Sequence, residues 1–123
     1  MNTDTALSLK KWAVVGATSN TNKFGCKVYQ KLKNCGYEVY AVNPGLEEVL
    51  GDKCYPNLAA LPTTVEIVNF VVPEAAALQV LQDMKTLGIK IAWFQPGADS
   101  KAVLALAKEL EIEIIQNCVL VAL

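Results

Sequence analysis

Short apolar runs alternate with amphipathic stretches along most of the chain. Residues 11–15 form the first apolar run, and residues 38–42 form the second. Between them Phe24, Val28 and Leu32 recur every four residues, which places them on one face of a helix over residues 24–34. Gly36 follows as a helix-ending residue. The pattern therefore predicts a strand, a helix and a second strand.

The second half of the chain repeats this alternation. Residues 67–72, 90–94 and 113–115 predict three more strands, and residue 69 is the only polar interruption of the first of these runs. One helix is expected from Pro73 to Gly88, and another after an N-cap at Asp99 or Ser100. Residues 46–62 are expected to be irregular, with at most one helical turn over residues 58–61. Residues 119–123 are an apolar end.

Strands that alternate with helices predict an α/β fold with right-handed crossovers. We expect a Rossmann-like, doubly wound parallel sheet of five strands in the order 3-2-1-4-5, with helices on both faces. Its switch point lies between the first and fourth strands, at the carboxyl ends where such folds bind ligands. A single domain covers residues 1–123, and residues 1–9 are expected as a loose arm or as a short helix laid on the domain.

Charge and composition exclude several classes of partner. The net charge is −1, from 11 basic and 12 acidic residues, and there is no basic stripe, so nucleic acid is disfavoured. No apolar stretch reaches the about 18 residues of a membrane span, and the N-terminus does not read as a signal peptide. The four cysteines form no Cys-x-x-Cys pair and there is no histidine, so no metal site is expected. Reduced thiols and a cytoplasmic location are the expectation.

The loop from Gly16 to Gly25 connects the first strand to the first helix, where phosphate sites are commonly built. It is not a Walker loop, because Lys23 precedes the glycine and no Ser or Thr follows it. It is not a dinucleotide fingerprint either, because Gly25 is the next glycine after Gly16. The end of the second strand also carries Asn43 in place of an acid. What remains suits a phosphate bound from one side; the alternative is a plain connection that binds nothing.

Several segments together resemble the small CoA-binding family, whose members are similar to the N-terminal domain of the succinyl-CoA synthetase alpha subunit. The likeness covers most of residues 10–118 and is carried by residues 13–19, 23–25, 36–44, 50–58, 61–62, 65–68 and 71–73. The most specific parts are the Val-Asn-Pro sequence of residues 42–44 and the later Gly…Tyr-Pro sequence of residues 51–56.

The resemblance implies a pocket for coenzyme A. The CoA phosphates would rest on the first loop and helix, at Gly16, Thr18, Ser19, Lys23, Phe24 and Gly25. The adenine end would lie near Asn43, Pro44, Val72 and Pro73, and the pantetheine arm would run toward Gln95, Pro96 and Gly97. Asn117 and Cys118 match an asparagine-cysteine pair of the related ligase subunits, which implies a thiol near the CoA sulfur. A buried cysteine at a strand end is the simpler interpretation of Cys118.

The residues give no sign of catalysis. Without histidine, the phosphohistidine step of the ligase relatives cannot occur in this chain, and no nucleophile–base pair is evident. We therefore expect a non-catalytic or regulatory protein that binds CoA or an acyl-CoA. Two alternatives stay open: an NAD(P)-binding, oxidoreductase-like domain, and an interaction subunit with a vestigial pocket. In the latter, residues 119–123 would contact a second copy or a partner subunit.

Overall fold

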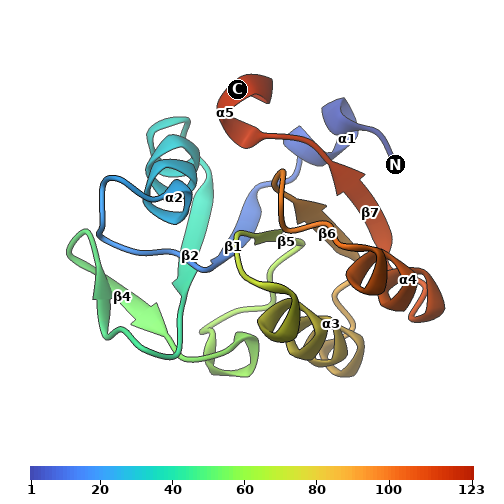
Figure 1. Cartoon of the computed structure of the whole chain (residues 1–123). Coiled ribbons are helices and arrows are strands. Elements are labelled where there is room, and N and C mark those ends of the chain that lie inside the picture. The colour runs from blue at the N-terminus through green and yellow to red at the C-terminus, as the bar shows by residue number, and fades with distance from the viewer.

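The computed structural model describes residues 1–123 and has a single sheet of seven strands in the order β3-β4-β2-β1-β5-β6-β7 (Figure 1). The strands are β1 (Lys11–Val15), β2 (Glu38–Val42), β3 (Glu48–Val49), β4 (Asp52–Tyr55), β5 (Ile67–Phe70), β6 (Ile91–Phe94) and β7 (Glu113–Gln116). The helices are α1 (Thr3–Leu7), α2 (Phe24–Asn34), α3 (Glu74–Leu87), α4 (Lys101–Glu109) and α5 (Val119–Ala122), with a short 3₁₀ helix η1 (Leu58–Ala60).

The α/β class and the mostly parallel, Rossmann-like sheet agree with the expectation, but the strand count and order were wrong. There are seven strands instead of five, and β3 pairs with β4 in antiparallel fashion. The third expected strand is β5, which pairs directly with β1 and does not lie outside β2. The neighbour of β2 on its other side is β4. The switch point therefore lies between β1 and β5.

The error has a physical cause in residues 46–62. This segment, which was expected to be irregular apart from a helical turn over residues 58–61, contains β3 and β4, and the expected turn is present as η1. Its strands bury only Val49 and Cys54, which is too short an alternation for a periodicity signal. The turn between them places Leu50 at φ 50° and Gly51 at φ 84°, a geometry that two-residue hairpins favour. With β4 counted, the six parallel strands follow the order 3-2-1-4-5-6 of the dinucleotide-binding fold.

Helices cover both faces of the sheet, as expected. In Figure 1, α1, α2 and α5 lie on one side and α3 and α4 on the other. A hydrophobic core lies on each face of the sheet. Successive β1 side chains pack into one core and then the other, because strand residues alternate between faces. Trp12 and Val14 pack toward α2, whereas Ala13 and Val15 pack toward α3. All four β5 residues are buried, which marks β5 as a central strand.

Both ends of the chain are packed against the domain. The N-terminal segment is a short helix, not a loose arm: Ala6 is fully buried, and the Leu7 carbonyl accepts a 2.5 Å hydrogen bond from the Tyr37 hydroxyl. At the other end the apolar residues form α5, which buries Val119 against the same core. No helix has the length and apolar character that a bilayer crossing requires.

Candidate functional site

The loop between β1 and α2 is held by two glycines in close contact. Gly16 has φ 99°, a left-handed conformation that glycine adopts without strain. A Cβ atom on Gly16 would lie 2.2 Å from the Val71 carbonyl oxygen. A Cβ atom on Gly25 would lie 2.1 Å from the Gly16 carbonyl oxygen. The first turn of α2 therefore packs directly on the end of β1, at the switch point of the sheet.

The N-terminus of α2 is open. Lys23 is its N-cap residue, no side chain caps the helix, and no acidic residue lies in its first turn. The amides of Phe24 and Gly25 belong to the first turn and have no acceptor within the helix. Phe24 is 61% exposed, so the entrance to this turn is accessible. Free amides and the positive end of the helix dipole favour an anion here.

Hydrogen bonds shape the loop ahead of this helix. The Ser19 hydroxyl accepts a 2.9 Å hydrogen bond from the Leu50 amide, which joins the loop to the turn between β3 and β4. The Thr18 hydroxyl accepts one of 3.2 Å from the Asn20 amide. Each hydroxyl thereby acts as an acceptor and keeps its own proton for donation. Both remain able to donate to a ligand oxygen.

Asn43 at the end of β2 is fully engaged with the backbone. Its Nδ2 donates to the Ala17 carbonyl at 3.0 Å, and its Oδ1 accepts from the Gly45 amide at 3.0 Å. The side chain thus ties the end of β2 to the first loop. A dinucleotide site needs a carboxylate at this place for the ribose hydroxyls, and Asn43 supplies none.

A cavity of about 480 Å³ opens at the carboxyl ends of β1 and β2, between η1 and α3. Its volume lies within the usual range for small-molecule sites. Four of the residues expected in the site line it: Gly16, Asn43, Pro44 and Val72. The other lining residues are Val15, Val42, Pro56, Asn57, Leu58, Ala76, Gln79, Val80 and Asp83. The walls near Pro44 and Val72 are apolar, as a slot for a flat base requires.

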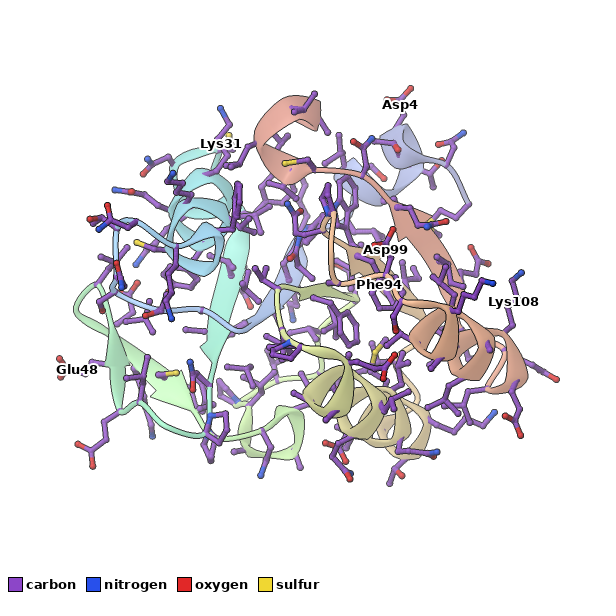
Figure 2. All side chains as sticks on the ribbon, in the orientation of Figure 1. Asp4, Lys31, Glu48, Phe94, Asp99 and Lys108 are labelled. Carbon is purple, nitrogen blue, oxygen red and sulfur yellow. The ribbon has the colours of Figure 1, made fainter.

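A second hollow of about 310 Å³ lies at the carboxyl ends of β6 and β7. Two expected residues, Pro96 and Cys118, line it together with Phe94, Asp99, Gln116, Asn117 and Val121. Phe94 and Asp99 lie close together beside the ends of these strands in Figure 2. A 3.0 Å hydrogen bond from Gln116 holds the pKa of Asp99 below its usual range.

Gln95 does not line either cavity, because it is 3% exposed and buried beneath the second hollow. Its Oε1 accepts hydrogen bonds from Trp93 Nε1 and from the Val119 amide, both at 3.0 Å. Its Nε2 lies 3.3 Å from Cys118 Sγ. Gln95 therefore joins β6 to the start of α5 and fixes the position of the Cys118 thiol.

The structure thus divides the expected site residues into three groups. Four line the larger cavity and two line the second hollow. The remaining eight line neither, and most belong to the loop and first turn of α2: Thr18, Ser19, Lys23, Phe24, Gly25, Pro73, Gln95 and Gly97. All fourteen stay predictions as ligand contacts.

Sequence reasoning missed the α3 wall of the larger cavity. Ala76, Gln79, Val80 and Asp83 follow a spacing of three, one and three residues, which puts them on one face of α3. This face is mostly polar or exposed, so a search for apolar stripes passes over it. Pro56 and Leu58 were missed as site residues because their segment was expected to be irregular.

One ionic cluster fixes the hairpin beside the loop. The Asp52 carboxylate accepts hydrogen bonds from Lys33 Nζ and, at 2.7 Å, from the Tyr29 hydroxyl. The hydrogen bond from Lys33, and to a smaller extent that from Tyr29, lowers the pKa of Asp52. Burial raises the pKa of Tyr29, and the hydrogen bond to Asp52 raises it further. The cluster ties α2 to β4, and through that hairpin to Ser19.

Comparison with known proteins gives a family match. A family model described as "CoA binding domain" matches residues 10–123. A hypothetical protein from Pyrococcus horikoshii OT3 superposes with a TM-score of 0.89 and 32% sequence identity, covering 97% of this chain and 84% of that one.

Curated ligases match over part of their length. Acetate–CoA ligase [ADP-forming] I of Archaeoglobus fulgidus is 41% identical over 61 residues, which are 50% of this chain and 9% of the ligase. The alpha subunit of acetate–CoA ligase [ADP-forming] II of Pyrococcus furiosus is 37% identical over 79 residues, which are 63% of this chain and 17% of the subunit. The chain therefore spans less than a fifth of the length of these ligases.

Proposed function

The chain belongs to the CoA binding domain family, and from this premise we propose that it binds coenzyme A or an acyl-CoA. One observation carries the proposal. The apolar cavity of about 480 Å³ and the uncapped N-terminus of α2 meet at Gly16, at the carboxyl end of β1. A ligand with a flat base and a diphosphate needs these two features side by side.

The ligand would lie across the switch point. The adenine base would enter the larger cavity between Pro44 and Val72. The diphosphate would bind the amides at the start of α2, with Lys23 and the hydroxyls of Thr18 and Ser19 as further donors. The pantetheine arm would then run toward the second hollow and bring the CoA sulfur to Cys118.

The proposed role is non-catalytic or regulatory. The chain has no histidine, and the Cys118 thiol in the second hollow receives its hydrogen bond from Gln95, an amide that cannot act as a general base. Two of its relatives are ligases that act with CoA, and one of those is an alpha subunit. A partner subunit, or a second copy, is therefore part of the proposal. So is a cytoplasmic location, which suits the four free thiols.

Thermal unfolding with added ligands tests the proposal. A ligand that binds the folded chain stabilises it by about 2.7 kcal/mol at a free concentration of 100 Kd. CoA should raise the unfolding temperature, and NAD should not, because Asn43 gives no carboxylate to the ribose. The difference between CoA and dephospho-CoA measures how much the 3′-phosphate contributes to the stabilisation. ATP is the control for general phosphate binding. Stabilisation by NAD and not by CoA would contradict the proposal.

A further inference from the structure

The larger cavity runs lengthwise along α3, from Ala76 near the first loop to Asp83 at the far end. Seven residues of helix span about 10 Å, which matches the combined length of a purine base and its ribose. A ligand that lay along this wall would have one end at Gly16 and the other at Asp83.

The two ends of this cavity differ in charge. At the Gly16 end lies the uncapped start of α2, whose N-cap residue is Lys23 and whose first turn has no acidic residue. At the other end Asp83 is the only ionisable residue among those that line the cavity. A carboxylate repels phosphate, so the far end suits the neutral part of a nucleotide.

The far end also offers a specific pair of polar groups. Gln79 Nε2 donates a 3.1 Å hydrogen bond to Asp83 Oδ1, which orients the carboxylate and leaves Oδ2 as an acceptor. Asn57 Oδ1 accepts from the Ala60 amide at 3.0 Å, so its Nδ2 remains a donor. Adenine presents the complementary pair, an exocyclic amino donor beside a ring-nitrogen acceptor.

We propose that Asp83 and Asn57 recognise the edge of the adenine base, with Asp83 accepting from the amino group and Asn57 donating to the adjacent ring nitrogen. The inference rests on the proposed function and specifies that the cavity recognises the adenine base of CoA. It makes Asp83 a specificity-determining residue that selects adenine and excludes phosphate from that end.

Calorimetric titration with two ligands tests this on the full chain. The ligands are CoA and 1,N6-etheno-CoA, in which the amino group and the ring nitrogen N1 are tied into a third ring. The unaltered chain should bind CoA at least about 10-fold more tightly than the etheno analogue, because the bridge removes the amino hydrogen that Asp83 accepts and blocks N1 as an acceptor beside it. Asp83→Ala should weaken CoA binding by about 10-fold and change the affinity for the analogue very little.

Two variants serve as controls. Asp83→Asn keeps an oxygen acceptor and should retain part of the discrimination, and it also provides a folded variant if the alanine change disturbs α3. Glu109→Ala removes a carboxylate from α4, outside the cavity, and should leave both affinities unchanged. Equal binding of CoA and its etheno analogue, or an equal loss of both in Asp83→Ala, would overturn the inference alone. An absence of CoA binding to the unaltered chain would overturn the proposed function together with it.

Discussion

The carbonyl oxygen of Gly16 occupies the space where a side chain on Gly25 would begin. A Cβ atom built on Gly25 comes within 2.1 Å of that oxygen and within 3.1 Å of the Gly16 carbonyl carbon. The contact joins the residue that directly follows β1 to the first turn of α2. It therefore sets how far the free amides of α2 stand from the cavity that Gly16 lines.

Gly25→Ala should destabilise the chain by about 1–3 kcal/mol, the usual cost of overpacking. The sign is informative, because a glycine-to-alanine change inside a helix otherwise stabilises by about 1 kcal/mol. CoA affinity should fall as well, since α2 must move off the loop. Denaturant unfolding measures the first effect and calorimetric titration the second.

Gly45→Ala is the matched control. Its Cβ atom would lie 3.5 Å from Asn43 Oδ1, an ordinary contact. This variant should unfold close to the unaltered chain. Equal stability of the two variants would contradict the role given to the Gly16–Gly25 contact.

Lys23→Ala should weaken CoA binding by about 5-fold, which corresponds to the roughly 1 kcal/mol typical of an exposed charge at a helix terminus. The loss should shrink as salt is added, because screening weakens exposed charge pairs. Lys90→Ala is the control, since Lys90 precedes β6 and so lies at the amino ends of the strands, away from the candidate site. An identical effect of the two changes at low salt would exclude a specific contact by Lys23.

Ala76→Trp should block the larger cavity. Ala76 is exposed and lines that cavity, so a large side chain fills space without disturbing the core. CoA affinity should drop by at least about 10-fold, a change of 1.4 kcal/mol. The unfolding temperature should not change.

Ala75→Trp places the same side chain one residue earlier, at an exposed position outside the cavity. It should bind CoA as the unaltered chain does. If both tryptophan variants bind CoA normally, the base lies elsewhere.

Asp52→Asn should make the stability of the chain less dependent on pH. The hydrogen bonds from Lys33 and Tyr29 lower the pKa of Asp52 from its ordinary value of 3.8. Because the folded-state pKa is the lower one, this stabilisation is present above pH 3.8 and is lost as the pH falls through the folded-state value.

The free energy of unfolding of the unaltered chain should therefore exceed that of Asp52→Asn by about 1 kcal/mol at pH 7, a typical net value for a partly exposed hydrogen-bonded pair. The gap should narrow steadily below pH 4. Urea unfolding at a series of pH values measures it, and a gap that does not vary with pH would speak against an ionised Asp52 in the cluster.

The sequence predicted the parts of this molecule that repeat a period. The apolar runs of β1 and β5 are strong signals because nearly all of their residues are buried on both faces of the sheet. The four-residue spacing found α2 because Val28 and Leu32 are buried, although Phe24 at the start of the same spacing is exposed. The strand order could not be recovered without β4. β4 pairs with β2 over only two residue pairs, and Cys54 is its one buried side chain, which leaves almost no trace in the pattern.

The sequence likewise predicted some of the residues that line the larger cavity and missed others. Glycine and proline positions such as Gly16 and Pro44 were found because a turn or a close approach demands these residue types. The α3 wall was not found, since Gln79 and Asp83 are ordinary residues for an exposed helix face. Their relevance comes only from the packing of α3 beside η1, which the sequence does not encode locally.

The central claim is that the cavity and the open start of α2 together hold coenzyme A. Isothermal titration of the full chain with CoA, and with NAD under the same conditions, tests it most directly. The account predicts saturable binding of one CoA per chain and no comparable binding of NAD. An absence of CoA binding, or NAD binding of equal or greater affinity, would contradict it.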